Sequence, residues 1–187
     1  MNTTYIILGV LGLIFLYFVY IYNRLISFRE RVKESSSDIE VMLKRRADLI
    51  PNLVETVKNY ASHEKEVFEK VTEARSAILN AQTVKDGLEA DNILTSALKT
   101  LFAVAENYPD LKANQNFLQL QQELVNTEDK IQASRRFYNS VLREYQSYKE
   151  SFPAGIVANI FKFPNFEYYE LEYEEKQTSQ KPPEVKF

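Results

Sequence analysis

The feature that most constrains this chain is an uncharged apolar run, YIILGVLGLIFLYFVYIY, at residues 5–22. Its 18 residues would form a helix of about 27 Å, close to the roughly 30 Å hydrocarbon core of a bilayer. Tyr5 at one end and Tyr22 at the other suit the two membrane interfaces. The run therefore predicts a single membrane-spanning helix, with membrane lipid as its partner.

A cleaved signal peptide is the alternative interpretation of this run. It requires basic residues before the apolar stretch and small residues at a cleavage site after it. Here MNTT precedes the run and NRLISF follows it, which favours an uncleaved anchor. Basic residues come only after the run, beginning with Arg24 and Arg29. The positive-inside rule therefore predicts a cytoplasmic C-terminal part and an N-terminus outside.

The composition favours helices over strands and excludes some chemistries. Only 4 Gly and 6 Pro occur in 187 residues, and so few helix breakers favour long helices. Hydrophobic residues make up 45% and charged residues 26%, as in folded proteins. The formal net charge of -3 does not indicate nucleic-acid binding. The absence of Cys excludes disulfides and thiol nucleophiles.

Apolar residues recur at helical spacing after the anchor, which predicts one long helix from Leu25 to about Ala81. A proline inside a helix removes one backbone hydrogen bond, so Pro51 is interpreted as a bend where the apolar seam changes phase. Asp48 would cap a helix restarting there. The predicted buried face comprises Leu25, Phe28, Val32, Ile39, Met42, Leu43, Leu53, Val57, Tyr60, Val67, Val71, Ala74, Ile78 and Ala81.

The sequence QTVKDGLEADN at residues 82–92 is interpreted as the first loop, because it is polar and contains Gly87. A shorter helix is predicted over about residues 92–106, with Asp91 or Asn92 as its cap. The fold class is therefore all-α: a single transmembrane helix followed by an elongated antiparallel bundle.

A turn is predicted at residues 106–114, where Asn114 is suited to cap the next helix. Tyr108 in this turn belongs to a structural turn or anchors a partner in a pocket. The following long helix extends to about Glu150. Its predicted buried face comprises Phe117, Leu120, Leu124, Ile131, Tyr138, Val141, Tyr145 and Tyr148.

Four regions are predicted: an anchor at 1–24, a helical bundle at 25–152, an aromatic and acidic arm at 153–175 and a flexible tail at 176–187. The arm contains a short apolar helix between two prolines. Its aromatic residues require a surface to cover, either the chain's own bundle or another copy, since the acidic residues disfavour anionic lipid. These residues are Phe161, Phe163, Phe166, Tyr168, Tyr169 and Tyr173.

The stretches LKRRADLIPNLVETVKNYASHE, VTEARSA and AVAENYPDLKANQNFLQLQQELVNTEDKIQASRRFYNSVLREY resemble the LemA family of bacterial membrane-associated proteins. YNRL and FKFPNFEYYE extend the likeness, which covers about residues 22–169. Ser35-Ser36-Ser37 and Asn59 depart from common family residues. The resemblance implies a helical bundle behind one span of a bacterial inner membrane, but no particular activity.

The only histidine, His63, is predicted to be structural or solvent-exposed. HEKEVFE lacks the second histidine of HExxH, and one histidine cannot supply the two Glu-x-x-His pairs of a di-iron bundle. No partner for a catalytic triad is visible either. The sequence therefore predicts no catalytic residue, no metal and no cofactor.

The basic cluster Lys44-Arg45-Arg46 lies 22 residues or more beyond Tyr22, about 33 Å along a helix. This distance exceeds several Debye lengths of about 8 Å, which argues against lipid headgroups as its partners. The cluster is then either a solvated face or pairs with carboxylates on a neighbouring helix or subunit. Asp48 and the acidic stretch 167–175 are also candidate partners.

Two hypotheses for function follow from these features. The first is a non-enzymatic, membrane-anchored scaffold that self-associates into a homo-oligomer, as a ring or cage if copies contact head-to-tail. The second is an adaptor or regulator of another membrane protein, such as a protease or sensor, that binds through KRRADLIPNLVE or the C-terminal arm.

Overall fold

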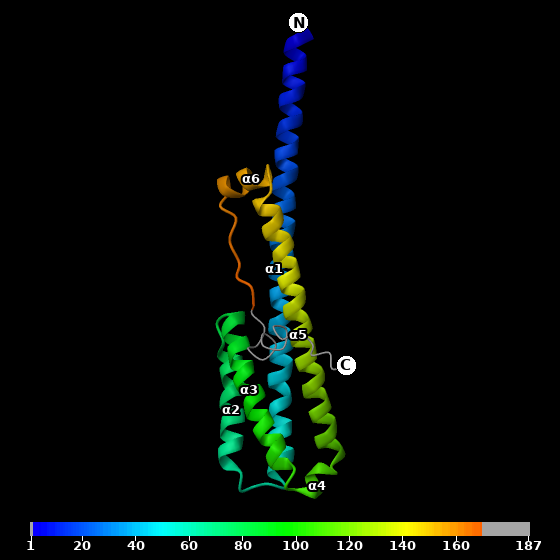
Figure 1. The fold of residues 1–187 in the computed structure, drawn as a ribbon, viewed down its shortest axis with the longest axis vertical. Helices are drawn as coiled ribbons and strands as arrows, with labels where there is room; N and C mark the ends of the chain where they lie inside the picture. Colours follow the sequence, from blue (N-terminus) through cyan, green and yellow to red (C-terminus); the bar gives the residue numbers. More distant parts are fainter. Residues whose placement is uncertain (1, 170–187) are drawn as a thin grey trace, which may run out of the picture.

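The structure is a computed structural model, which describes residues 2–169. All regular elements in this range are α-helices, which confirms the all-α prediction. Tyr173 and the predicted tail at 176–187 lie outside the described residues. Two long helices, α1 (Asn2–Lys58) and α5 (Gln115–Glu150), pack against each other and form the spine of an elongated molecule (Figure 1).

The first part of α1 extends beyond the bundle (Figure 1). Every side chain from Thr3 to Tyr20 is exposed, and Ile21 is the first buried residue. This part of α1 is long and apolar enough to cross a membrane. Its exposed side chains are compatible with the predicted anchor, since the same residues would be costly to leave in water.

The remainder of α1 buries a continuous apolar seam, which keeps the same phase before and after Pro51. The predicted phase change at this proline is wrong, and α1 does not restart at Asp48, which is exposed. Steps of four and three residues keep one face of the helix toward the bundle. The buried residues at these steps are Ile39, Leu43, Arg46, Ile50, Leu53 and Val57.

The predicted long helix ends much earlier than Ala81. α1 stops at Lys58, the chain turns through residues 59–64, and α2 (Lys65–Asn80) begins there. The amide of Ala61 closes the last turn by donating to the carbonyl of Val57 at 2.9 Å. The sequence hides this turn because Tyr60, which lies inside it, and Val67 on α2 are seven residues apart, which resembles the spacing of a continuous helix.

The predicted loop at residues 82–92 is also wrong, because α3 (Val84–Ala105) begins within it. Thr83 and Asp86 form a capping box, in which each side chain accepts a hydrogen bond from the other's backbone amide. Gly87 lies inside α3, where an added β-carbon would come within 3.0 Å of Leu43 Cδ1. This glycine therefore allows close helix packing and does not mark a loop.

The predicted turn before the last long helix is confirmed and contains the one-turn helix α4 (Pro109–Lys112). Asn114 caps α5, since its side-chain oxygen accepts a hydrogen bond from the amide of Phe117 at 3.1 Å. The predicted face of α5 is confirmed as well. Its residues Phe117, Leu124, Ile131, Tyr138, Val141 and Tyr145 are buried, and Leu120 and Tyr148 are partly buried.

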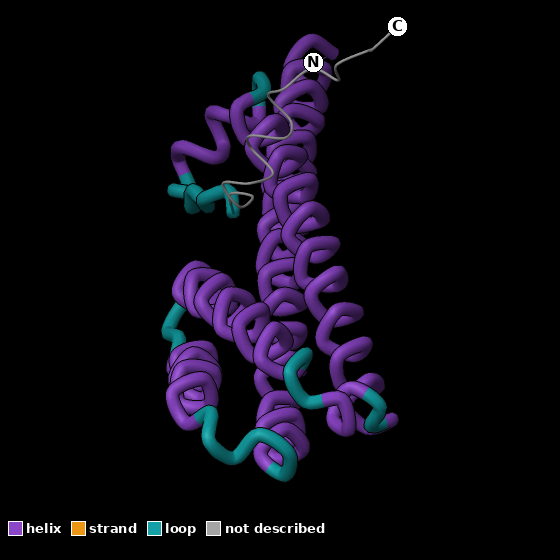
Figure 2. Tube along the Cα trace, turned by 60° about the horizontal axis from the view of Figure 1, so that its bottom comes forward, coloured by secondary structure: helices purple, strands orange, loops and turns teal. Residues whose placement is uncertain are grey.

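The spine is covered by different elements along its length (Figures 1 and 2). We call the part covered by α2 and α3 the distal half, because it is remote from the exposed end of α1. The proximal half is covered by two parts of the predicted arm at 153–175, namely α6 (Ala154–Ile160) and the extended residues 161–169. From here on, the arm means only the extended residues 161–169. The predicted short helix between two prolines is thus confirmed as α6.

Candidate functional site

The most unusual feature of the distal half is a buried arginine at the junction of three helices. The side chain of Arg46 on α1 is 2% exposed. Its Nη1 donates to both carboxylate oxygens of Asp91 on α3, at 2.8 and 2.9 Å. Its Nη2 donates to Glu128 Oε2 on α5 at 2.8 Å. These charge-assisted hydrogen bonds connect α1, α3 and α5 through one side chain.

The environment of this ion cluster differs between its inner and outer ends. Burial raises the pKa of the Asp91 carboxyl, while the positive charges of Arg46 and Arg135 oppose that rise. The side chain of Glu128 is 37% exposed, so the outer end of the cluster reaches solvent. Removing one partner of a buried ion pair leaves an uncompensated charge, so we assign this cluster a structural role.

The predicted basic cluster does not form a single surface. Lys44 and Arg45 are exposed, whereas Arg46 points into the bundle. Arg45 Nη2 lies 3.3 Å from Glu123 Oε2 on α5. Carboxylates on neighbouring helices are therefore the partners of Arg45 and Arg46, as one of the two interpretations predicted. Of the two further candidate partners, Asp48 is exposed, and the acidic stretch 167–175 lies mostly outside the described residues.

Pro51 has a specific consequence for the packing of α2. It has no amide hydrogen, so the carbonyl of Ala47, four residues earlier, loses its usual helical donor. Arg75 on α2 replaces that donor, because its Nε donates to the Ala47 oxygen at 2.9 Å. The proline therefore creates a backbone acceptor that α2 uses to dock on α1.

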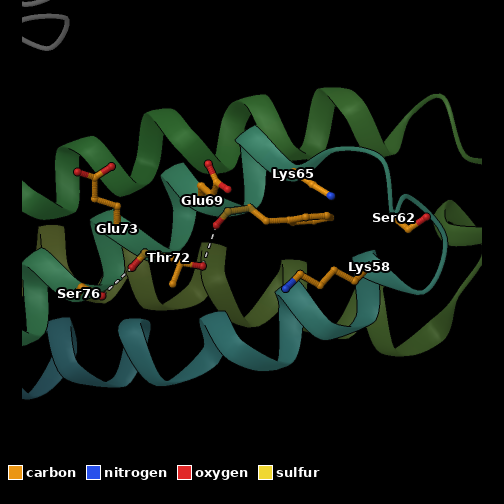
Figure 3. A pocket seen from close by; sticks show the side chains of 8 residues that line it. Lys58, Ser62, Lys65, Glu69, Thr72, Glu73 and Ser76 are labelled. Carbon is orange, nitrogen blue, oxygen red and sulfur yellow. Dashed lines mark hydrogen bonds between the residues drawn. The ribbon is translucent and has the colours of Figure 1, made fainter.

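A groove of about 650 Å³ lies at the distal end, between the end of α1 and α2 (Figure 3). Lys58 and Lys65 lie at one end of it, with Glu69 and Glu73 farther along α2. The hydroxyl of Thr72 donates to a carbonyl of its own helix at 2.7 Å, as Ser76 does at 2.9 Å. The hydroxyls of Thr72 and Ser76 are therefore used within α2 and are not activated by a neighbouring base.

The remaining predicted site residues of the distal half contact their own chain or solvent. The hydroxyl of Tyr108 donates to Glu64 Oε1 at 3.3 Å, and the side-chain Nδ2 of Asn114 donates to the Tyr60 hydroxyl at 3.0 Å. These contacts join the two turns at the distal tip. His63 is exposed, as predicted. Among the described residues, no group of three or more His, Cys, Asp or Glu is suited to hold a metal.

The aromatic residues of the arm pack on the chain's own spine. The Tyr22 ring lies 4.7 Å from the Phe161 ring and 5.8 Å from the Phe163 ring, between centroids. Phe166 meets Tyr145 edge-on at 5.7 Å. Tyr169 stacks on Tyr138 of α5 at 4.4 Å. Of the two surfaces that the sequence left open, the structure places the arm on its own bundle.

Side chains of α5 also satisfy the backbone of the extended arm. The hydroxyl of Tyr145 donates to the Pro164 carbonyl at 2.7 Å, and that of Tyr138 donates to the Glu167 carbonyl at 3.0 Å. Asn139 exchanges two hydrogen bonds with the backbone of Tyr169, at 2.8 and 3.0 Å. Burial raises the pKa of both tyrosine hydroxyls, which remain protonated donors at neutral pH.

From the sequence, Arg46 is predicted only as a candidate for pairing and Asp91 only as a cap. Neither Glu128 nor Arg135 is singled out there, although the buried charges leave a signal in the apolar seams. Arg46 and Asp91 occupy positions where the apolar seams of α1 and α3 require a buried residue. Arg135 is likewise buried in the seam of α5 and donates to Gln132 at 3.3 Å. A charge at a seam position is expensive to bury alone, so each predicts an oppositely charged partner in a facing seam.

Comparisons with known proteins agree with the resemblance. Residues 35–187 match the model of the LemA family. Protein LemA of Metamycoplasma hominis is 29% identical over 182 residues, covering 94% of this chain and 83% of that protein. Magnetosome protein MamQ 2 of Paramagnetospirillum magneticum is 27% identical over 175 residues, covering 80% of this chain. The chain spans 64% of the length of that magnetosome protein.

Proposed function

The chain belongs to the LemA family, and on this premise we propose that it is a non-enzymatic helical scaffold, anchored in a membrane by the first part of α1, that self-associates. The apolar side chains exposed between Thr3 and Tyr20 support the anchor. The basic residues that follow support a cytoplasmic bundle at a bacterial inner membrane.

The use of the charged side chains supports a non-enzymatic role. Catalytic sites hold titratable groups in a cleft, aimed at a position that a substrate can reach. In the described part of the chain, the buried ions of the Arg46 cluster face one another. Two tyrosines of α5 with raised pKa, Tyr138 and Tyr145, donate to the arm. These groups therefore serve packing between elements of one chain.

The observation that carries the self-association proposal is a pair of exposed apolar side chains on α5. Leu118 and Val125 are each 47% exposed and lie seven residues apart, so they share one face of the helix. Phe137 adds a third exposed apolar side chain farther along α5. A second copy of this chain is the proposed occupant of this face, and a head-to-tail arrangement would close into a ring or cage.

The test is the mass of the full-length protein in mild detergent, measured by light scattering. The wild-type chain is expected to form a defined oligomer. The double substitution Leu118→Glu and Val125→Glu should reduce that oligomer to monomers, because each contact would bury an unpaired charge. Ile93→Glu is the matched control, because Ile93 is 60% exposed but lies on α3. A wild-type monomer at micromolar concentration would overturn the proposal.

The adaptor hypothesis remains as a second candidate because of the groove beside α2. The groove is lined by two cations, Lys58 and Lys65, at one end and by two carboxylates, Glu69 and Glu73, farther along. A segment of another membrane protein with an acidic side chain facing the lysines and a basic one facing the glutamates would fit this lining. Crosslinking in native membranes should then recover a partner with the wild-type chain but not with Lys58→Glu and Lys65→Glu. Recovery of the bait alone would count against this candidate.

A further inference from the structure

The short helix α6 has two different faces. Ala154, Val157 and Ala158 are buried against the spine. On the other side, Ile156 and Ile160 point into solvent, and their spacing of four residues places them on one face of the helix. These two side chains are 47% and 67% exposed, and the patch also includes Phe152 in the turn before α6 and Phe161 directly after it, which are 86% and 59% exposed.

This patch lies at the level where the apolar run of α1 ends. Tyr22 is the last residue of that run, and its ring contacts the Phe161 ring at 4.7 Å between centroids. Ile21 and Leu25, on either side of it, are already buried in the bundle. Figure 1 shows α6 running sideways from the spine at the level where the exposed part of α1 leaves the bundle.

The charges around the patch are suited to phospholipid headgroups. Residues 152–166 contain no Asp or Glu, whereas Lys162 is exposed beside the patch. Arg24 on the neighbouring turn of α1 is exposed as well. Basic side chains next to exposed apolar ones are typical of helices that lie in the interface of a membrane with anionic lipids.

We propose that α6 is a second membrane contact, which lies in the headgroup region of the leaflet from which α1 emerges, with Phe152, Ile156, Ile160 and Phe161 facing the acyl chains. The occupant of this face is lipid, because the patch is continuous with the proposed anchor through the contact between Tyr22 and Phe161. The inference rests on the anchor of the proposed function. Two contacts on one membrane hold the spine upright, with its distal half farthest from the lipid.

The chain contains no tryptophan, so a single introduced tryptophan reports on one site. Ile156→Trp places the probe on the patch, and Leu79→Trp is the matched control on α2, since the two residues are 47% and 43% exposed. The full-length variants are reconstituted into vesicles of phosphatidylcholine and phosphatidylglycerol, with and without bromine near the headgroup end of the acyl chains. Bromine quenches tryptophan only on contact.

The Ile156→Trp emission is expected to shift to shorter wavelength and to lose intensity in brominated vesicles, while Leu79→Trp does neither. Equal intensity in both kinds of vesicle for Ile156→Trp would overturn the inference. A blue shift without bromine quenching would also overturn it, and would indicate a protein neighbour on the patch.

A third variant separates this inference from the anchor on which it rests. Ile14→Trp lies within the apolar run and is 48% exposed, close to the value for Ile156. Bromine at the ends of the acyl chains should quench it if α1 spans the bilayer. Quenching of Ile14→Trp without quenching of Ile156→Trp rejects α6 as a membrane contact and keeps the anchor. Failure of both rejects the anchor as well.

Discussion

The elements that cover the distal and proximal halves of the spine satisfy their backbone hydrogen-bonding groups in opposite ways. In the distal half, α2 and α3 are helices that satisfy their own backbone groups, and side chains such as Arg46 and Arg75 supply the polar contacts that hold them. In the proximal half, the extended arm has free backbone carbonyls, and α5 supplies their donors through Tyr138 and Tyr145. The difference arises because a helix pairs most of its own backbone groups, whereas an extended segment relies on side chains or water for donors.

The two halves should therefore fail differently when a polar contact is removed. A lost ion in the distal half leaves a full charge buried among apolar side chains, which is costly. A lost hydroxyl in the proximal half leaves a carbonyl near the surface of the molecule, where water replaces the donor at small cost. The predictions below test this contrast from the largest expected effect to the smallest.

Asp91→Ala is expected to have the largest effect. It leaves the Arg46 guanidinium buried with only the partly exposed Glu128 as its partner. The free energy of unfolding should fall by about 3–5 kcal/mol, measured by urea denaturation of the full-length protein in detergent. Glu123→Ala, which breaks the exposed pair with Arg45, is the control and should change it by about 0–1 kcal/mol.

Replacing the buried ion pair by apolar residues sharpens the same point. The double substitution Arg46→Met and Asp91→Leu should recover most of the stability that Asp91→Ala loses, because no unpaired buried charge remains. If the double variant were as unstable as Asp91→Ala, lost helix packing and not the uncompensated charge would explain the effect.

Arg75→Ala is expected to have an intermediate effect. It removes the donor to the Ala47 carbonyl, and the free energy of unfolding should fall by about 1–3 kcal/mol. Pro51→Ala restores an amide that can donate to the same carbonyl. Arg75→Ala should therefore cost clearly less in a Pro51→Ala background. Equal cost in both backgrounds would show that the hydrogen bond to Ala47 is not the contribution of Arg75.

Tyr145→Phe is expected to have a smaller and local effect. Losing the hydrogen bond to the Pro164 carbonyl should weaken docking of the arm by about 0.5–1.5 kcal/mol. The measurement is the rate of tryptic cleavage after Lys162, which should rise while global unfolding changes little. Tyr168→Phe removes a hydrogen bond of an exposed hydroxyl to Gln146, and its cleavage rate should stay close to that of the wild-type chain.

Alkaline pH should loosen the arm without any substitution. Burial raises the pKa of Tyr138 and Tyr145 above the ordinary tyrosine value of about 10. Their contribution to stability is therefore complete below about pH 10 and is lost as the pH rises through their pKa in the folded protein. An absorbance titration of phenolate should show late-titrating groups, one of which disappears in Tyr138→Phe. An unchanged late phase in that variant would contradict the assignment.

Most of the fold could be predicted from apolar spacing alone. The seam of α5 and the first buried residues of α1 are where the pattern places them, because a helix that packs along its whole length must repeat every three or four residues. The turn at residues 59–64 could not be seen, since the spacing of seven residues from Tyr60, inside the turn, to Val67 mimics a continuous helix. The sequence predicts a loop at Gly87 because it does not show that the side chain of Leu43 packs closely against this residue.

The candidate site was less predictable than the fold. The run Lys44-Arg45-Arg46 looks uniform in sequence, yet the helix turns each residue in a different direction and buries only the third. The seam position of Arg46 was readable, but its partner Asp91 lay in a segment interpreted as a loop. The density of aromatic residues in the arm predicts that they cover a surface. Their spacing does not reveal whether that surface belongs to the same chain or to another copy.

The central claim is that one chain covers both halves of its own spine, and a crosslink across the arm tests it most directly. The chain has no cysteine, so Gln146→Cys and Tyr168→Cys introduce the only two thiols, at side chains that contact at 2.8 Å. A short bismaleimide should join them within one chain and give a crosslinked monomer in a denaturing gel. Crosslinked dimers or ladders instead would show that the arm covers a neighbouring copy, and would contradict the account.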